Sequence, residues 1–319
     1  MKIVAVTAGG RSSEYEISLK SAHTIIDSID RETFLPYLVV IGKEDWYAEV
    51  DGQKYPIDKN DFSFNLNGNT IRFEKVYNTI HGTPGEDGKI QGYFDLLNIP
   101  YTGCDVLTSS ITFNKYYCKQ IVSAHGIKTA ASVLLLGKDT FKAQEIPEKL
   151  GYPCFVKPNN GGSSFGASKV EAESELEAAV DLAFEHDNQV LIEEYIKGRE
   201  LTCGVYNDKQ KEPHALPITE IISKNAFFDY KAKYEGQSQE ITPAALDKHT
   251  TYECQGLSEK IYKILNCNGL VRIDYLLKDG ILYFMEVNTT PGCSRESIIP
   301  QQIAAAGLSR KTIISNQLS

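Results

Sequence analysis

The sequence predicts an α/β protein whose first domain is built on a parallel sheet. We expect a buried strand over Lys2–Thr7, a turn at Gly9-Gly10, and an amphipathic helix over about Ser18–Ile29. A second strand is expected over Tyr37–Ile41. Strand, helix and strand in this order form a βαβ unit, which makes the two strands parallel and places ligands at their carboxyl ends.

Composition narrows the classes of function. The 319-residue chain has room for about two domains, and three smaller ones also fit. It carries 33 Lys and Arg against 42 Asp and Glu, a net charge of −9, with no basic run. This balance argues against a nucleic-acid partner, which needs a basic surface. A small anionic ligand still fits, because net charge does not reveal a local basic pocket.

The sequence also argues against export and membrane insertion. The apolar start is interrupted by Thr7 and Gly9 and is too short for a signal peptide. No run approaches the ~18 apolar residues of a membrane span. The 7 cysteines are scattered and never spaced as CxxC, which is typical of reduced thiols. We therefore expect a cytoplasmic protein with no membrane partner.

The remaining elements are expected in the following order. A polar stretch over Trp46–Asn69 is assigned no element, and a strand over Val76–Ile80 runs into the glycine-rich loop His81–Gly88. A helix begins at Ile90, and a break near Gly103 marks the first domain boundary. Beyond it we expect one helix over Thr108–Ala124, a strand over Ser132–Leu136, a weaker helix over Lys142–Leu150, a strand over Phe155–Pro158, a helix over Glu173–Glu185, a strand over Val190–Tyr195, a helix over Tyr252–Asn266 and a helical tail.

The most informative local geometry is a hairpin of two strands, Leu270–Leu277 and Ile281–Asn288. If Lys278–Gly280 is a three-residue loop, Arg272 lies opposite Glu286. A two-residue turn would shift the register by one residue and scatter the polar side chains. With the longer loop, the period of two along a strand places four polar residues on one face, namely Arg272, Asp274, Glu286 and Asn288.

This face is a candidate metal site. Two carboxylates and an amide oxygen, from Asp274, Glu286 and Asn288, suit Mg²⁺, which usually takes its remaining ligands from water and nucleotide phosphates. The pattern fits equally well a solvated polar face that carries an Arg–Glu ion pair.

Three further segments carry candidate ligand groups. The loop Gly161–Gly166 can bring backbone N–H groups close to phosphate oxygens, with Lys157 just upstream, although such loops are often only turns. The strand Leu191–Ile196 combines apolar walls with carboxylates, as adenine and ribose contacts require, or is simply a core strand. After Pro291-Gly292, Ser297 is expected to cap a helix whose N-terminus could bind a carboxylate or an oxyanion.

Taken together, these segments resemble the D-alanine–D-alanine ligase family. Single motifs are weak, whereas their joint order and spacing over nearly the whole chain are specific. The matching segments are Gly9–Ser18, His81–Gly88 with Gln91-Gly92, Pro100–Gly103, Gly161–Gly166, Phe228–Tyr230 with Lys233-Tyr234, Arg272–Asp274 and Glu286–Gly292.

The resemblance implies a three-domain ATP-grasp fold within the α/β (α+β) class. Residues 1–103 would form an N-terminal parallel-sheet domain of the preATP-grasp, Rossmann-like kind. Residues 104–195 would form the central ATP-grasp domain. Residues 196–319 would form the C-terminal one, with a lid loop around residues 226–243 and the metal site. ATP would lie between the last two domains, and the family's usual assembly implies a homodimer.

The resemblance also assigns the nucleotide and metal contacts. Lys115 and Lys157 would contact the ATP phosphates, Glu193 with the Tyr195-Ile196 backbone would border adenine, and Glu200 would hold the ribose. The whole implied ATP-binding set is Lys115, Lys157, Ser164, Glu193, Glu194, Tyr195, Ile196 and Glu200. Two Mg²⁺ or Mn²⁺ ions would be bound by Asp274, Glu286 and Asn288, in agreement with the hairpin argument.

The amino-acid substrates are assigned in the same way. Glu14 would bind the ammonium group of the first D-alanine, near His81, with Ser163 and Tyr234 linked to it by hydrogen bonds. Arg272 and the Gly292 N–H group would form an oxyanion hole, and Lys233 and Ser297 would bind the second carboxylate. The implied catalytic set is Glu14, Ser163, Tyr234, Arg272, Gly292 and Ser297.

The activity implied is ATP-dependent ligation of two D-alanines through a D-alanyl phosphate, for peptidoglycan precursor synthesis. The nearest alternative is a sister ligase that forms D-alanyl-D-lactate or D-alanyl-D-serine. The alternative from another class is a non-catalytic nucleotide-binding ATP-grasp protein. Departures from the family pattern, none of which removes a metal ligand or an oxyanion donor, occur at Tyr15, Asn114, Glu194, Phe228 and Cys293-Ser294.

Overall fold

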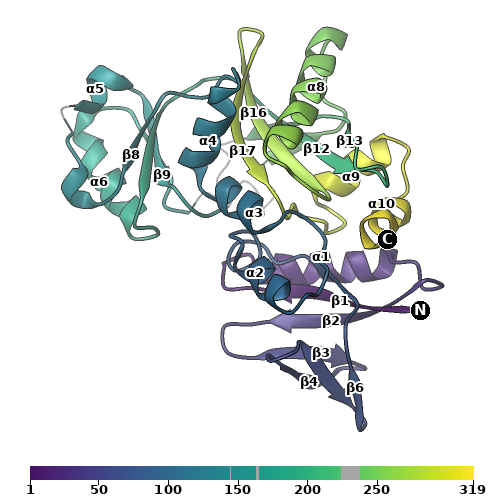
Figure 1. Cartoon of the computed structure of the whole chain (residues 1–319). Helices are drawn as coiled ribbons and strands as arrows, with labels where there is room; N and C mark the ends of the chain where they lie inside the picture. Colours follow the sequence, from purple (N-terminus) through teal and green to yellow (C-terminus); the bar gives the residue numbers. More distant parts are fainter. Residues whose placement is uncertain (144, 163–164, 224–237) are drawn as a thin grey trace.

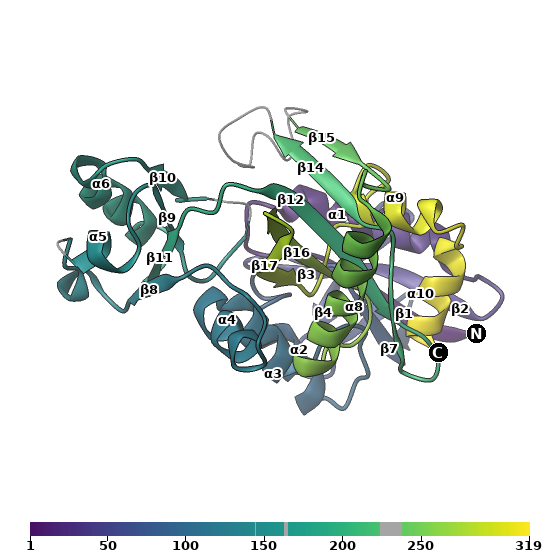
Figure 2. The same cartoon turned by 90° about the horizontal axis from the view of Figure 1, so that it is seen from above.

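The computed structural model describes residues 1–143, 145–162, 165–223 and 238–319. Three sheets each form the centre of one part of the molecule, which we call the N-terminal part, the central lobe and the C-terminal part. The central lobe, drawn in teal in Figure 1, projects sideways from the other two, and Figure 2 shows the same projection from above. Within the described ranges, no helix has the length and apolar character needed to cross a membrane.

The N-terminal part contains β1 (Lys2–Gly9), α1 (Tyr15–Ser28), β2 (Phe34–Ile41), β3 (Trp46–Val50), β4 (Gln53–Asp58), β5 (Ser63–Leu66), β6 (Asn69–Ile71), β7 (Lys75–Asn78) and α2 (Lys89–Leu96). Its strands lie in the order β6-β5-β4-β3-β2-β1-β7. β1 is parallel to both β2 and β7, which confirms the predicted βαβ unit. The strands beyond β2 pair antiparallel, so the sheet as a whole is mixed.

The prediction was wrong for the polar stretch that begins at Trp46, which forms the four antiparallel strands β3 to β6. Two tight turns connect them in pairs, Asp51-Gly52 and Asn67-Gly68, and all four residues have positive φ. Such turns match the twist of a hairpin. Aromatic side chains bury the inner face, as Phe64 of β5 and Phe62 just before β5 do against Phe73.

The central lobe contains β8 (Ser132–Leu135), a 3₁₀ turn (Lys138–Thr140), α5 (Glu145–Lys149), β9 (Cys154–Pro158), β10 (Ser168–Val170), α6 (Glu173–Phe184) and β11 (Val190–Glu194). The strands pair antiparallel in the order β10-β9-β11-β8. Helix α6 covers β9 and β10, and Leu176 and Val180 share a core with Val156 and Ile192. The predicted strands and the helix over Glu173–Glu185 are confirmed.

The C-terminal part contains β12 (Arg199–Asn207), β13 (Pro213–Ala215), β14 (Thr219–Ser223), β15 (Ser238–Ile241), α8 (Lys248–Ile264), β16 (Val271–Lys278), β17 (Ile281–Asn288), α9 (Ile298–Ala305) and α10 (Arg310–Leu318). The order of strands is β15-β14-β12-β16-β17, and β13 pairs with β12. Helix α8 begins earlier than predicted, because the Asp247 side chain caps it by accepting a hydrogen bond from Thr250 N at 3.0 Å.

Two helices stand where one was predicted over Thr108–Ala124. They are α3 (Val106–Phe113) and α4 (Lys115–Ala124), and Asn114 separates them with an extended backbone. Its side chain caps α4 by accepting a hydrogen bond from Tyr117 N at 3.0 Å. Both helices pack against β17, and Cys118 and Val122 lie in the core of the C-terminal sheet. The domain boundaries at 103/104 and 195/196 stay predictions.

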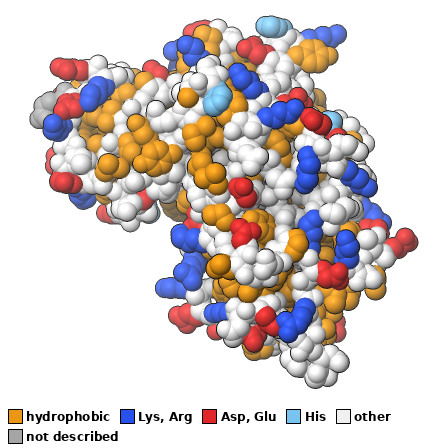
Figure 3. All heavy atoms as spheres, in the orientation of Figure 1, with side chains coloured by type: hydrophobic (Ala, Val, Ile, Leu, Met, Phe, Trp, Pro, Cys, Tyr) orange, Lys and Arg blue, Asp and Glu red, His pale blue; other side chains and the backbone are white. Residues whose placement is uncertain are grey.

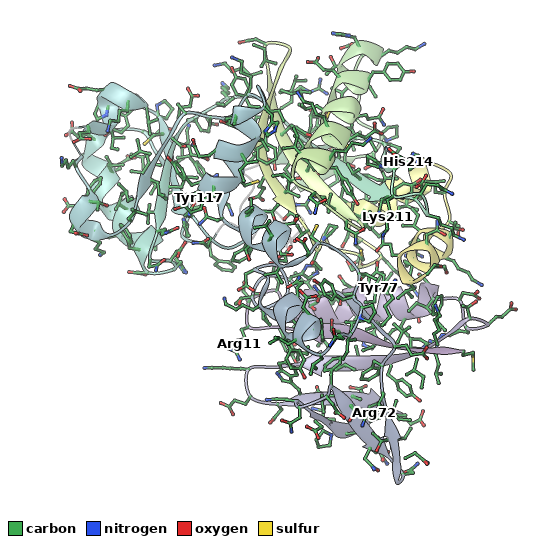
Figure 4. All side chains as sticks on the ribbon, viewed as in Figure 1. Arg11, Arg72, Tyr77, Tyr117, Lys211 and His214 are labelled. Carbon is green, nitrogen blue, oxygen red and sulfur yellow. The ribbon has the colours of Figure 1, made fainter. Side chains whose placement is uncertain are left out.

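One hydrophobic core joins the two ends of the chain. Val4 and Val6 of β1 share it with Ile303 of α9 and Ile314 of α10. Tyr77, labelled in Figure 4, belongs to the same core and lies where the N-terminal sheet meets the C-terminal helices. The N-terminal part and the C-terminal helices are therefore packed as one unit.

Gly85, in the loop that carries His81, has no room for a side chain. A Cβ atom placed there would lie 2.0 Å from Ile80 O and 2.5 Å from Ile80 Cβ. The Gly85 backbone is also held, because its carbonyl accepts hydrogen bonds from Asn78 Nδ2 at 3.0 Å and Gln91 Nε2 at 2.7 Å. The loop cannot move aside without losing these bonds.

We therefore expect Gly85→Ala to destabilise the fold by about 1–3 kcal/mol or more, as overpacked cores do. Gly256→Ala is the matched control, because a Cβ at Gly256 in α8 would meet nothing within 4 Å. That change should be neutral or stabilising by up to about 1 kcal/mol, since alanine favours helix over glycine. Urea unfolding measures both, and a Gly85→Ala protein as stable as wild type would contradict the packing.

Candidate active site

The hairpin of β16 and β17 carries the predicted metal-binding face, but its register differs from the prediction. The turn has two residues, Asp279 and Gly280, with φ of 51° and 76°, and the strands pair directly on either side of it. The predicted three-residue loop is therefore wrong. The predicted pairing of Arg272 with Glu286 is also wrong, because Arg272 pairs with Asn288.

A β-bulge returns to one face the polar side chains that the shorter turn would have placed on opposite faces. Tyr275 pairs with Phe284, whereas the next residue, Asp274, pairs with Glu286, so Met285 is an extra residue in β17. One extra residue changes which face the following side chains occupy. As predicted, one face carries Arg272, Asp274, Glu286 and Asn288.

Asp274 is the centre of a hydrogen-bonded group on this face. Its Oδ1 accepts from Arg272 Nε at 2.9 Å and from Thr202 Oγ1 at 2.5 Å. Its Oδ2 accepts from Arg272 Nη2 at 2.8 Å and from Asn288 Nδ2 at 2.9 Å. Asp274 and Arg272 are only 5% and 8% exposed, so these bonds fix both the carboxylate and the plane of the guanidinium group. Thr202 was not predicted, and the signal for it is its position opposite Asp274 on β12.

Three lysines and two glutamates form a charged group beside this face. Lys115 Nζ lies 3.3 Å from Glu286 Oε2 and donates to Gly161 O at 2.5 Å. Lys157 Nζ lies 2.5 Å from Glu193 Oε2, and Lys119 donates to the other oxygen of Glu193. Three ammonium groups against two carboxylates leave an excess positive charge, which suits a phosphate chain.

Burial shifts the pKa values of two of these lysines. It lowers the pKa of Lys157 to about 8, and the ammonium group of Lys115 acts in the same direction. It also lowers the pKa of Lys119 well below its usual range, with Lys157 contributing. Lys119 was not predicted, and its signal is the spacing of four residues from Lys115, which places both on one face of α4.

The other predicted nucleotide contacts lie around the end of β11 and the start of β12. Glu194 Oε1 accepts a hydrogen bond from Ala131 N at 2.9 Å, so this side chain is bound to the backbone before β8. Lys169 Nζ lies 4.3 Å from the centre of the Tyr195 ring, and Ile196 is buried. Glu200 pairs with Leu276 across β12 and β16. Glu193, near the end of β11, contacts Lys119 and Lys157.

The loop after β17 meets the N-terminal part. His81 Nδ1 lies 2.8 Å from Thr290 O, and its Nε2 lies 3.3 Å from Ser21 Oγ. Ser21 Oγ also accepts from Cys293 N at 3.2 Å. Burial raises the pKa of Cys293 to about 12, so this thiol stays protonated at neutral pH and is a poor nucleophile.

Glu14 and Glu86 lie close to the same loops. Glu14 is buried at the start of α1, and a Cβ on Gly162 would lie 3.4 Å from its Oε2. Glu86 accepts from Gly82 N at 2.7 Å and from Thr290 N at 3.2 Å, which joins the two loops. Glu86 belongs to the recognised loop motif, but no role was predicted for it.

Ser297 holds the N-cap position of α9, as predicted, but its side chain makes no capping hydrogen bond. The capping role is therefore wrong. Its Oγ instead lies 2.8 Å from Ser294 Oγ, and a Cβ on Gly292 would approach it to 2.9 Å. Ser297 thus lies beside the Gly292 backbone.

Four predicted site residues lie outside the described residues, namely Ser163, Ser164, Lys233 and Tyr234. Residues 226–237 of the expected lid also lie outside them.

Two family models match the chain. The model of the D-ala D-ala ligase N-terminus matches residues 3–104, and that of the D-ala D-ala ligase C-terminus matches residues 121–319. A D-alanine–D-alanine ligase of Phocaeicola vulgatus is 48% identical over 317 residues, covering 99% of this chain and 98% of that protein. The corresponding ligase of Azobacteroides pseudotrichonymphae is 49% identical over 319 residues, covering 99% of this chain and 98% of that protein.

Solved structures are similar over the same length. VanG D-Ala:D-Ser ligase from Enterococcus faecalis superposes with a TM-score of 0.89 at 33% identity, covering 99% of this chain and 98% of that one. D-alanine–D-alanine ligase from Bacillus anthracis, complexed with ATP, superposes with a TM-score of 0.78 at 29% identity, covering 100% and 97%.

The lowered pKa of Lys157 predicts a pH limit for binding of a phosphate chain. We expect the affinity for inorganic tripolyphosphate to fall as the pH rises through about 8, because Lys157 then loses its proton and its charge. Above that pKa the fall approaches roughly tenfold per pH unit if only the charged form binds. Calorimetric titration at several pH values, without metal, measures it.

Lys157→Arg is the matched control, since a guanidinium group stays charged throughout this range. Any fall that comes from titration of the ligand itself persists in the Lys157→Arg protein and can be subtracted. Identical pH profiles for the two proteins would show that Lys157 does not control binding.

Proposed function

The chain belongs to the D-alanine–D-alanine ligase family, and on this premise we propose how its described residues perform the reaction. It is an ATP-dependent ligase with the ATP-grasp fold, and it joins two D-alanines into D-alanyl-D-alanine for cell-wall synthesis. The single observation that carries the proposed mechanism is that the face of Asp274, Glu286 and Arg272 lies directly beside Lys115.

The ATP phosphates are proposed to bind at Lys115 and Lys157. Their ammonium groups already hold carboxylates and a carbonyl, and a phosphate chain presents the same kind of acceptor oxygen at higher charge. The base would lie beside Glu193 to Ile196, with Glu194 bound to the backbone at its edge, and the ribose at Glu200. Ser164, outside the described residues, stays a predicted phosphate contact.

The donor atoms of Asp274, Glu286 and Asn288 fit two Mg²⁺ or Mn²⁺ ions. They supply carboxylate and amide oxygens on one face of the hairpin, as these hard cations prefer. Asn288 donates its amide N–H group to Asp274, which leaves its oxygen as the candidate ligand. When bound, the ions neutralise phosphate charge and orient the γ-phosphate for attack.

The first step is proposed at the end of the site near Glu14 and His81. Glu14 binds the ammonium group of the first D-alanine. The carboxylate of this D-alanine attacks the γ-phosphate of ATP, which releases ADP and forms D-alanyl phosphate. Lys115 and Lys157 stabilise the charge of the transferred group. Ser163 and Tyr234 are predicted to close this end of the site.

In the second step, the amino group of the second D-alanine attacks the carbonyl of D-alanyl phosphate, and inorganic phosphate leaves. Arg272, oriented by Asp274, and the Gly292 N–H group stabilise the oxyanion, a role worth ~3–4 kcal/mol per donor. Ser297, beside Gly292, is proposed to bind the second carboxylate together with Lys233.

We also propose a three-domain division at 103/104 and 195/196, a cytoplasmic location and a homodimer. The free, buried cysteines are consistent with a reducing compartment.

The homodimer is supported by exposed apolar side chains. Leu96 on α2 and Leu107 on α3 are 84% and 67% exposed on packed neighbouring helices, and Figure 3 shows hydrophobic side chains over this side of the molecule. Sedimentation equilibrium should give the mass of two chains, and the mass of one chain would contradict the proposed homodimer.

The second candidate function is D-alanyl-D-serine synthesis, favoured by the similarity to the D-Ala:D-Ser ligase structure. We expect D-alanyl-D-alanine to dominate when the enzyme is given ATP, Mg²⁺ and equal amounts of D-alanine, D-serine and D-lactate. Mass spectrometry of the products measures the ratio. A majority of D-alanyl-D-serine or D-alanyl-D-lactate would assign the chain to a sister activity. ATP binding with no D-alanine-dependent phosphate release would mark a non-catalytic protein.

Glu286→Gln tests the metal assignment. We expect it to lower D-alanine-dependent phosphate release at least about a hundredfold, because an amide cannot replace the lost charge beside the transferred phosphoryl group. Glu145→Gln is the matched control, since Glu145 pairs with Lys149 on the exposed helix α5. Mn²⁺ binding, followed by electron paramagnetic resonance, should weaken only in the first variant. Near-normal turnover of Glu286→Gln at saturating Mg²⁺ would refute the assignment.

A further inference from the structure

Lys119, on α4, is a buried lysine to which the proposed reaction assigns no role. The residue is 2% exposed, and a lysine is almost never buried to this extent unless it is paired. Its ammonium group donates to Oε1 of Glu193. The burial of Lys119 therefore depends on this carboxylate.

The pair joins two parts of the molecule that have separate cores. Helix α4 packs against β17, and Cys118 beside Lys119 lies in the core of the C-terminal sheet. Glu193 lies on β11, where its neighbour Ile192 belongs to the core of the central lobe. The ion pair therefore sets the position of the Glu193 carboxylate relative to Lys115, one turn earlier on α4.

Glu193 has a second lysine partner, and the two lysines differ in access. Lys157 Nζ lies 2.5 Å from Oε2, and 13% of its side chain is exposed, against 3% for Lys119. If Lys157 were the only partner, a phosphate would have to compete with Glu193 for its charge. Because Lys119 also neutralises Glu193, the two lysines and Glu193 together keep one uncompensated positive charge. Lys157 is the lysine that faces a ligand.

We propose that Lys119 is a positioning residue of the nucleotide site. It holds Glu193 across the junction between the central lobe and the C-terminal part and neutralises it, so that the charge of Lys157 serves the phosphate chain. Lys119 itself does not touch the nucleotide. The inference rests on the proposed binding of ATP at Lys157 and Glu193.

The test is a double-mutant cycle on ADP binding, measured by calorimetry in EDTA and without D-alanine. We expect Lys119→Met to weaken binding about tenfold or more, and Lys119→Arg to retain binding within about threefold of wild type. In a Glu193→Gln background, Lys119→Met should have no further effect, because the lysine acts only through that carboxylate. Lys138→Met is the matched control, since Lys138 pairs with Asp181 on the exposed surface of the same lobe, and it should change nothing.

The steady-state kinetics give a second readout that a purely structural role would not produce. Lys119→Met, or Lys119→Gln if the methionine variant does not fold, should raise the KM for ATP and leave the KM for D-alanine unchanged. Unchanged ADP affinity in folded Lys119→Met, or an effect of Lys119→Met that persists in the Glu193→Gln background, would overturn the proposal. Failure of the wild-type protein to bind ADP would refute the proposed function instead.

Discussion

The chemistry of this site depends on one extra residue in β17. Because side chains alternate along a strand, the two-residue turn by itself would direct Glu286 and Asn288 into the hydrophobic core. Met285 interrupts the alternation, so Phe284 and Val287, three residues apart, both remain in that core. The same bulge returns Glu286 to the face of Asp274, so two acidic side chains and Arg272 lie together on one face of the hairpin.

Each part of the molecule contributes a different kind of group to that face. The C-terminal sheet supplies carboxylate and amide oxygens and the arginine, and Thr202 and Asn288 hold Asp274 by hydrogen bonds. Helix α4 and the central lobe supply lysines that are paired with carboxylates and buried. The N-terminal part supplies His81 and Glu86, which hold the loop after β17 by hydrogen bonds. The polar groups around the centre of the site therefore come from all three parts of the molecule.

Much of this arrangement could be predicted from the sequence, and the failures have physical causes. The βαβ unit and the polar face of the hairpin follow from periodicity. The register was wrong because the turn has two residues instead of three, and because a bulge leaves no mark in a single sequence. The strands from Trp46 were missed although Asp51-Gly52 and Asn67-Gly68 are typical hairpin turns. Lys119 belongs to no recognised motif, and its importance comes from a tertiary contact with Glu193 that local sequence does not encode.

The core shared by β1, α9 and α10 has a consequence for how the chain is made. During synthesis β1 and α1 leave the ribosome first, but the core that they form is completed by Ile303 and Ile314, which are translated last. Domains commonly fold as they emerge. Here the core around β1 and α1 stays incomplete until translation is nearly finished, so the nascent chain at this stage exposes apolar side chains that are buried in the finished protein.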